Sequence, residues 1–317
     1  MSSRGLEISL AVWSVVAGAL FLTAPEPPER PGTTPEDEAI FQRTVDQTVE
    51  KTRRWQEERG DWTIPWDEAE GHMAILIDDV GRELHLLGQL QALRFQLSFS
   101  VLPGAVYAPG AQLRLRADRR RHRDVLLHLP CEPLDATKML AGADAAETFL
   151  RLGDTPEQLR GALVDALARV PGAVGVNNHM GSRLTADRAA MDALMPVLRE
   201  RGLFFLDSRT TADSQGLAAA EAAGVEAVGR DIFLDHDPAP AAILAQFAEA
   251  ARRARDRPVV VLAHPSQAVV DVLKEGLPRL HAEGIGVYPV REILARAPRA
   301  VGVDEPYGPA KTDISAQ

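Results

Sequence analysis

The sequence contains almost no cysteine. Cys131 is the only one among 317 residues, so the chain can form no internal disulfide and no cysteine-based zinc cluster. An excess of positive charge is also missing: the formal net charge is −10 at pH 7, which argues against a nucleic-acid-binding protein. Neither glycine-rich phosphate loop, GxxxxGK or GxGxxG, is present, so the sequence indicates no nucleotide cofactor. The GxSxG motif of serine hydrolases is absent too, which disfavours a nucleophilic serine.

One long uncharged run lies near the amino terminus. It extends from Ile8 to Ala24 and follows Arg4. This length is at the short end for a membrane-spanning helix, and it also fits the apolar core of a signal peptide. Either alternative places the rest of the chain on the extracytoplasmic, periplasmic side of the inner membrane, with Arg4 inside. Because no convincing cleavage site follows, we favour an uncleaved anchor.

The sequence divides into four parts. Residues 1–24 form the signal anchor or signal peptide, and residues 25–71 form a linker that is rich in Pro and Glu and includes a charged helix. Residues 72–297 form the main domain, and residues 298–317 form a loose, polar tail.

Short apolar runs alternate with helical patterns throughout the main domain. Seven runs are expected to be strands: residues 73–77, 95–102, 125–129, 173–176, 203–206, 231–234 and 259–262. A shorter strand is expected at residues 285–288, and Thr155 and Thr185 are expected to cap helices. The alternation predicts an α/β fold with a mostly parallel sheet, as a barrel or as an open doubly wound sheet.

Six of the seven expected strands end in polar residues. The exits are Asp78–Asp79, His128 with Glu132, Asn177–His179, Asp207–Arg209, Asp235–Asp237 and His264. Because the carboxyl ends of parallel strands share one face of a sheet, these side chains are expected to meet there. Adjacent residues of a strand point to opposite sides, so Asp78 and Asp79 are expected to have different roles.

The residue types at this face suit a divalent metal. A carboxylate with two imidazoles is typical of a catalytic Zn²⁺ site that leaves one position open for water. Hydrolysis of an amide or ester also needs a base for the proton of the water and an acid for the leaving group. A second Asp and a further His are the candidates for these roles.

Five segments resemble the divergent polysaccharide deacetylase family. They are Ile77–Gly81, Leu127–Pro133, Asn177–Ser182, Phe205–Thr211 and Leu262–Pro265, and the resemblance covers about residues 72–295. The family is similar to the NodB-type carbohydrate esterases. The resemblance therefore implies a distorted (β/α) barrel of about seven mostly parallel strands with a metal-dependent de-N-acetylase site.

The resemblance also implies roles for individual residues. Asp78 matches the catalytic base, Asp79 the metal-binding Asp, and His264 the late His that acts as general acid. His128 matches the first His of the His-x-x-x-His metal pair, but Glu132 stands where the second is expected. His179 is the candidate replacement, so Asp79, His128 and His179 are the expected metal ligands. Glu132 is then a substitute ligand, a neighbour of the ligands or a substrate contact.

The remaining polar residues are assigned to the substrate. Asn177 and Asn178 follow the fourth expected strand, and Asp207, Ser208 and Arg209 follow the fifth. A buried pair between Arg209 and Asp207 is the alternative for the second group.

Two functions are compatible with this sequence. The first is an extracytoplasmic hydrolase that removes N-acetyl groups from a cell-envelope glycan, with water activated by a metal, an Asp base and a His acid. The second is a non-catalytic envelope protein on the same scaffold that binds glycan or a partner protein. Asp78, Asp79 and His264 favour the first function, and Glu132 favours the second.

Overall fold

A computed structural model describes residues 43, 47, 60–118, 123–141 and 147–297 of the chain. The predicted membrane segment, the charged helix of the linker apart from residues 43 and 47, and the polar tail lie outside these residues. Within the described ranges, no helix is long and apolar enough to cross a membrane.

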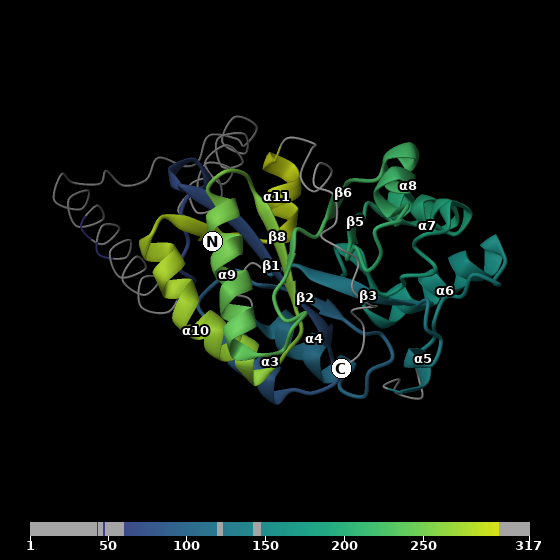
Figure 1. Cartoon of the computed structure of the whole chain (residues 1–317), viewed down its shortest axis with the longest axis horizontal. Coiled ribbons are helices and arrows are strands. Elements are labelled where there is room, and N and C mark those ends of the chain that lie inside the picture. The colour runs from purple at the N-terminus through teal and green to yellow at the C-terminus, as the bar shows by residue number, and fades with distance from the viewer. Residues whose placement is uncertain (1–42, 44–46, 48–59, 119–122, 142–146, 298–317) are drawn as a thin grey trace, which may run out of the picture.

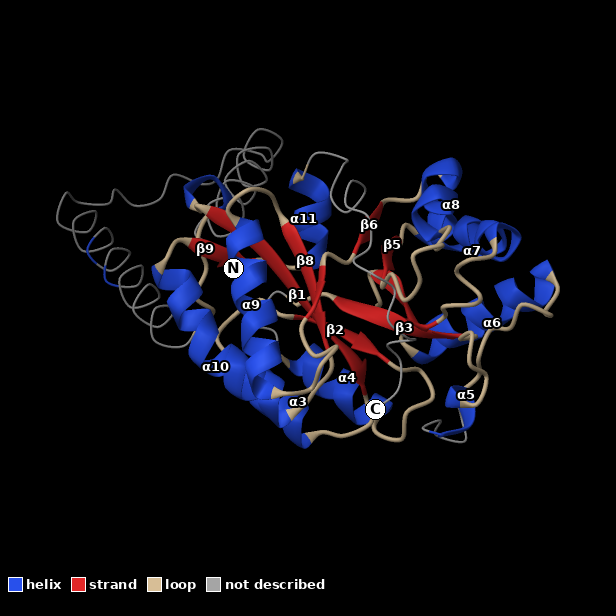
Figure 2. Cartoon of the chain, viewed as in Figure 1, coloured by secondary structure: helices blue, strands red, loops and turns tan. Residues whose placement is uncertain are grey.

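The fold is an α/β half-barrel of parallel strands, which confirms the predicted fold class (Figures 1 and 2). The strands run in the order β6-β5-β4-β3-β2-β1-β8-β7, and β9 pairs with β1. Their bounds are β1 Gly71–Val80, β2 Ser98–Val101, β3 Val125–Cys131, β4 Gly175–Met180, β5 Phe204–Asp207, β6 Ala227–Gly229, β7 Ile232–Phe233, β8 Val259–Ala263 and β9 Ile285–Val287. The strand predicted at residues 231–234 is only the second half of a bent segment, because β6 and β7 follow one another and pair with different neighbours.

Helices cover the convex face of the sheet, with α9 and α10 toward one end of the molecule and α6, α7 and α8 toward the other (Figure 1). The bounds are η1 Trp66–Glu68, α3 His85–Ala92, α4 Ala108–Ala117, α5 Lys138–Ala141, α6 Pro156–Arg169, α7 Arg188–Arg201, α8 Gly216–Ala223, α9 Pro240–Ala254, α10 Gln267–Ala282 and α11 Val290–Arg296. Thr155 caps α6 in a capping box with Gln158, as predicted. The prediction for Thr185 is wrong: Asp187 caps α7, and the Thr185 hydroxyl donates to the carbonyl of Gly181 at 2.8 Å.

The alternation of side chains along the strands separates two buried clusters. On β1, Met73, Ile75 and Ile77 belong to the large cluster under the helices, whereas Ala74 and Leu76 belong to a smaller cluster on the concave face. Inward-facing residues of β3, β5, β6 and β8 complete the smaller cluster, together with side chains of α11. The next inward positions toward the carboxyl ends of the strands carry polar side chains, which form a polar layer above this inner core.

Candidate functional site

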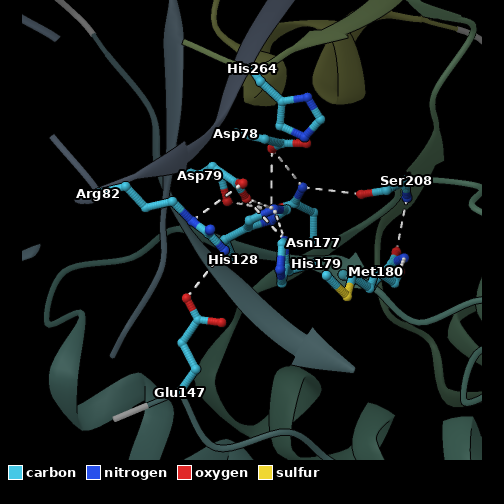
Figure 3. Close-up of polar contacts among 12 residues, drawn as sticks. Asp78, Asp79, Arg82, His128, Glu147, Asn177, His179, Met180, Ser208 and His264 are labelled. Atoms are coloured by element: carbon cyan, nitrogen blue, oxygen red, sulfur yellow. Dashed lines mark hydrogen bonds and ion pairs between the residues drawn. The ribbon is translucent and has the colours of Figure 1, made fainter. Parts of the chain in front are cut away.

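The polar layer is built by continuing the inward alternation of four strands. Asp78 follows Ala74 and Leu76 on β1, and His128 follows Leu126 on β3. By the same spacing His264 follows Val260 and Leu262 of β8, and Ser208 follows Phe204 and Leu206 of β5. On β4, Asn177 is the register partner of His128. The close-up in Figure 3 shows these side chains converging from several strands.

Asp79 enters the same layer because the backbone leaves the strand conformation. Its φ angle is 53°, and the pairing of β1 with β2 changes register between Ile77 and Val80. Both carboxylates then approach one imidazole: Asp78 Oδ1 lies 3.8 Å from Nδ1 of His128, and Asp79 Oδ1 lies 3.1 Å from its Nε2. The expectation that the two side chains point to opposite sides is therefore wrong, although their partners do differ.

Left-handed backbone also occurs at the ends of two neighbouring strands. Met180 at the end of β4 has a φ angle of 53°, and Arg209 after β5 has a φ angle of 49°. Such conformations cost about 1–3 kcal/mol each for residues other than glycine and persist where the surroundings enforce them. Within the described part of the chain, the non-glycine residues with positive φ are these two and Asp79, so this strain is confined to the carboxyl edge that carries the site.

Three side chains from three strands form a group suited to a metal ion. Asp79 Oδ1 lies 3.0 Å from Nδ1 of His179, and this nitrogen lies 3.3 Å from Nε2 of His128. A carboxylate oxygen and two imidazole nitrogens are a donor set for Zn²⁺ or a similar divalent ion. Asp79 Oδ1 is buried and lies 3.0 and 3.1 Å from one nitrogen of each imidazole, so all three donor atoms face one another. These donors therefore fit the divalent metal that the sequence predicts.

Asn177 fixes the orientation of His128. Its Oδ1 accepts a hydrogen bond from the Ser100 hydroxyl and lies 3.1 Å from Nδ1 of His128, while its amide nitrogen donates to Asp78 Oδ1 at 2.9 Å and to Ser208 Oγ at 3.1 Å. Because Asn177 Oδ1 can only accept, Nδ1 of His128 carries a proton, and Nε2 faces Asp79 and His179, where it can bind a metal ion once its own proton is lost. Such an outer partner sets the tautomer of a metal-binding histidine.

Replacing Asn177 with leucine should weaken the metal site without removing a ligand. We expect zinc affinity to fall by about 10–100-fold, the usual effect of losing an outer partner. The free energy of unfolding should fall by about 3 kcal/mol, because several buried groups lose a partner. Calorimetric zinc titration and denaturant unfolding measure these effects. Ser208→Ala, which removes one acceptor of Asn177, is the graded control, and an equally large loss of affinity in that variant would contradict the role of Asn177.

The charges of the metal group are coupled. Burial acts to raise the pKa of Asp79, but the neighbouring His179 and His128 hold it well below its usual range. Burial lowers the pKa of His179, which favours the neutral imidazole that binds metals. Burial also acts to lower the pKa of His128, but Asp78 and Asp79 more than offset it and raise that pKa.

Asp78 and His264 form a second pair of titrating groups beside the metal group. Burial raises the pKa of Asp78, against the opposing charges of His128 and His264. Burial acts to lower the pKa of His264, but its hydrogen bond with Asp235 and the surrounding carboxylates raise it to about 9. At neutral pH, this arrangement provides a base of raised pKa next to a protonated imidazole, a combination suited to proton transfer.

Asp235 holds His264 in place; it was predicted among the polar strand ends but was given no role in the site. Its Oδ2 lies 3.3 Å from Nδ1 of His264, and its carboxylate accepts from the backbone N–H of His264 at 3.2 Å. Its position after a predicted strand is the signal that could have identified it. Arg82 was also missed: its Nε lies 3.5 Å from Asp79 Oδ2, and its Nη2 lies 3.2 Å from Glu147 Oε1. No pattern in the sequence points to Arg82 or Glu147.

The structure does not bring Glu132 into the metal group. One carboxylate oxygen lies 3.0 Å from Arg183 Nη1, and the other accepts from the backbone N–H of Leu152 at 2.7 Å. Glu132 is the first residue after β3, and its carboxylate contacts the segments of Leu152 and Arg183 instead of the metal group. Its suggested role as a substitute ligand is therefore wrong, since both oxygens hold the loops around the site.

The side chains of two more predicted substrate contacts form hydrogen bonds within the protein instead. Asn178 accepts from the backbone N–H of Ser208 at 2.9 Å and donates to the carbonyl of Met180 at 2.7 Å. Asp207 accepts from the backbone N–H of Arg209 at 2.8 Å and from the Ser214 hydroxyl at 2.7 Å. The contact between Arg209 and Asp207 is a hydrogen bond from the backbone, whereas the predicted alternative was a buried pair of their side chains. Asn177 and Ser208 are predicted substrate contacts whose side chains do reach the polar layer.

Replacing Glu132 with glutamine separates a structural role from metal binding. We expect the free energy of unfolding to fall by about 1–2 kcal/mol, because a charge-assisted hydrogen bond to a backbone N–H is weakened and the ion pair to the half-exposed Arg183 adds little. Zinc affinity, measured by calorimetric titration, should stay within about twofold of the wild type. A loss of zinc binding in a folded E132Q protein would instead return Glu132 to the ligand set.

Comparison with known proteins identifies the family. A family model described as divergent polysaccharide deacetylase matches residues 75–294. The chain is 36% identical over 213 residues to an uncharacterized protein of Haemophilus influenzae, covering 67% of this chain and 73% of that protein. It is 34% identical over 206 residues to the uncharacterized Escherichia coli protein YibQ, covering 65% of this chain and 62% of YibQ.

A solved structure shares the fold. The crystal structure of an uncharacterized protein from Agrobacterium tumefaciens C58 is similar with a TM-score of 0.63 and 23% sequence identity, covering 73% of this chain and 93% of the other. The family match spans the half-barrel from β1 to α11, including every residue of the metal group. The chain therefore belongs to the divergent polysaccharide deacetylase family.

Proposed function

We propose that this protein is a metal-dependent hydrolase that removes N-acetyl groups from a glycan of the cell envelope. The observation that carries the proposal is the convergence of Asp79, His128 and His179 on one point, next to the pair Asp78 and His264. A divalent ion held there would lower the pKa of water and polarise a carbonyl oxygen.

The side chains around the ion have complementary roles in amide hydrolysis. The oxygen of the attacking water bonds to the acetyl carbon. At the same time Asp78, whose pKa is raised by burial, takes a proton from this water. His264, protonated and held by Asp235, gives a proton to the nitrogen as the carbon–nitrogen bond breaks. The products are acetate and a free amine. Asn177 keeps both Asp78 and His128 in position throughout.

An apolar rim next to the site supports a sugar substrate. We define the apolar rim as Val106, Tyr107 and Leu134, which are 67%, 49% and 67% exposed. The backbone N–H of Tyr107 donates to the carbonyl of Gly81 at 2.8 Å, and that of Leu134 donates to Ser182 Oγ at 2.9 Å. The rim is thus tied to the two loops that follow Asp79 and His179. An exposed aromatic ring can pack on the apolar C–H face of a sugar.

Replacing Tyr107 with alanine should weaken the binding of long substrates. We expect KM for an N-acetylated oligosaccharide to rise about tenfold, equivalent to about 1.4 kcal/mol, with kcat nearly unchanged. Leu113→Ala is the control, because Leu113 is another exposed large apolar residue, on α4 and outside the rim. Initial rates over a range of substrate concentrations test this, and equal KM values for Y107A and L113A would remove the rim from the substrate site.

The proposal also includes an extracytoplasmic location. It is supported by the uncharged run from Ile8 to Ala24 after Arg4, which suits an inner-membrane anchor or a signal peptide. A cell-envelope glycan, with peptidoglycan as the first candidate, is then within reach of the site.

Release of acetate tests the proposed function. The zinc-loaded full-length protein is incubated with N-acetylglucosamine oligomers and with peptidoglycan, and acetate and free amines are measured together. We expect equal amounts of both products, far less of both from the Asp78→Asn variant, and none after chelation. Glycan binding without acetate release by the zinc-loaded protein would overturn the hydrolase and favour the non-catalytic binding protein.

A further inference from the structure

The half-barrel has a seam between β6 and β7, which are joined by two residues. β6 pairs with β5 and β7 pairs with β8, so these two short strands form the ends of the strand order. Arg230 and Asp231 lie between them. The backbone N–H of Arg230 donates to the carbonyl of Asp207 on β5 at 2.9 Å, and that of Asp231 donates to the carbonyl of Val260 on β8 at 2.8 Å. The chain therefore changes partner strand at this point.

The guanidinium of Arg230 is buried at the seam and holds the segment after β5. Its Nε donates to the carbonyl of Ser208 at 2.8 Å, and its Nη2 donates to the carbonyl of Arg209 at 3.0 Å. Arg209 is one of the residues with left-handed backbone. A planar guanidinium can hold two consecutive carbonyls in this way, whereas the single ammonium of lysine cannot reproduce the fork.

The same guanidinium also contacts the other side of the seam. It lies over the ring of Phe233, with 5.2 Å from Cζ to the ring centroid, and this ring lies 5.0 Å from the ring of His264. Asp235, which holds His264, follows Phe233 by two residues. A cation over an aromatic ring is an attractive contact, stronger where water is excluded.

These contacts join the two halves of the site. On one side, the Ser208 hydroxyl accepts a hydrogen bond from the Asn177 amide, and Asn177 orients His128 and Asp78. On the other side, Phe233 packs against His264. We infer that Arg230 is a positioning residue that links Ser208 to Phe233 across the seam and so sets the position of His264 relative to Asp78. The inference rests on the proposed function only where turnover is concerned.

Two substitutions at Arg230 and a neighbouring control test this role. Arg230→Lys keeps the charge but loses the paired hydrogen bonds to the carbonyls of Ser208 and Arg209. Arg230→Met removes both the charge and these hydrogen bonds. Arg257→Met is the matched control, because Arg257 Nη1 lies 2.8 Å from the buried Asp231 on the same bend without contacting the site segments named above. A loss of stability without a change in the site is expected for this control.

The measurement is histidine NMR on the full-length, metal-free protein with labelled imidazole rings. The chain has eight histidines, and the His128 and His264 signals are assigned from single substitutions. We expect both signals to move in R230K and R230M and to stay in place in R257M. In zinc-loaded protein, kcat should fall by about 10–100-fold in R230K with KM little changed, the effect of misplaced but intact catalytic groups.

The NMR readout does not depend on whether the protein has hydrolase activity. If the wild type releases no acetate, the proposed function fails, but movement of the two imidazole signals still supports the positioning role. If R230M does not fold, the histidine signals of R230K test the positioning role. Wild-type positions of both signals in a folded Arg230 variant would overturn the inference and leave Arg230 as a stabilising residue only.

Discussion

Replacing Asp79 with asparagine is expected to lower the affinity for zinc by at least about a hundredfold, more than the loss of an outer partner. Asparagine has nearly the same shape and tolerates the left-handed backbone observed at this position. It removes the negative charge that the two histidines surround at 3.0 and 3.1 Å. The substitution therefore acts on metal binding with little change in backbone conformation.

Calorimetric titration of the full-length protein with zinc measures this loss. Asp213→Asn is the matched control, because Asp213 is an exposed carboxylate outside the metal group. The control should bind one zinc ion with wild-type affinity. Unchanged zinc binding in D79N, with circular dichroism showing a folded protein, would exclude Asp79 as a ligand.

The second large effect is expected at Asp78. The Asp78→Asn variant should lose about 10²–10⁴-fold in kcat, the usual contribution of a general base, while its zinc affinity stays within about tenfold of the wild type. An asparagine oxygen can still accept the hydrogen bond that Asn177 donates at 2.9 Å, so the neighbouring groups keep their places. The variant thus separates proton transfer from metal binding.

Acetate release and zinc titration on the same D78N preparation distinguish these two effects. A variant that binds zinc and glycan but whose kcat falls by this factor agrees with the assignment. Wild-type kcat in D78N would show that Asp78 is not the base, and a complete loss of zinc would show that its role lies in metal binding.

Much of the site can be predicted from local sequence patterns that extend over a few residues. Apolar runs that end in Asp78, His128, Asn177 and His264 predict parallel strands whose carboxyl ends bring these side chains together. The structure does so because the inward alternation begun by apolar residues on each strand continues into the polar layer. The five family segments add the assignment of each residue, which spacing alone does not provide.

The parts that could not be predicted depend on single backbone angles or on contacts distant in sequence. The left-handed conformation of Asp79 brings both carboxylates to the site. The alternation of side chains along a strand does not predict where such a residue occurs. Glu132 has a suitable position in the motif, but its oxygens are taken by Leu152 and Arg183. The fork of Arg230 at the bend between β6 and β7 is likewise a tertiary contact.

The coordination of zinc by the full-length protein tests the central claim most directly. X-ray absorption at the zinc edge reports the type and distance of the bound atoms. A centre formed by Asp79, His128 and His179 predicts one zinc ion per chain with nitrogen and oxygen neighbours at about 2.0–2.2 Å, two of them imidazoles, and no sulfur. A folded protein that takes up no zinc, or one whose zinc has a sulfur neighbour at about 2.3 Å, would contradict the proposed centre.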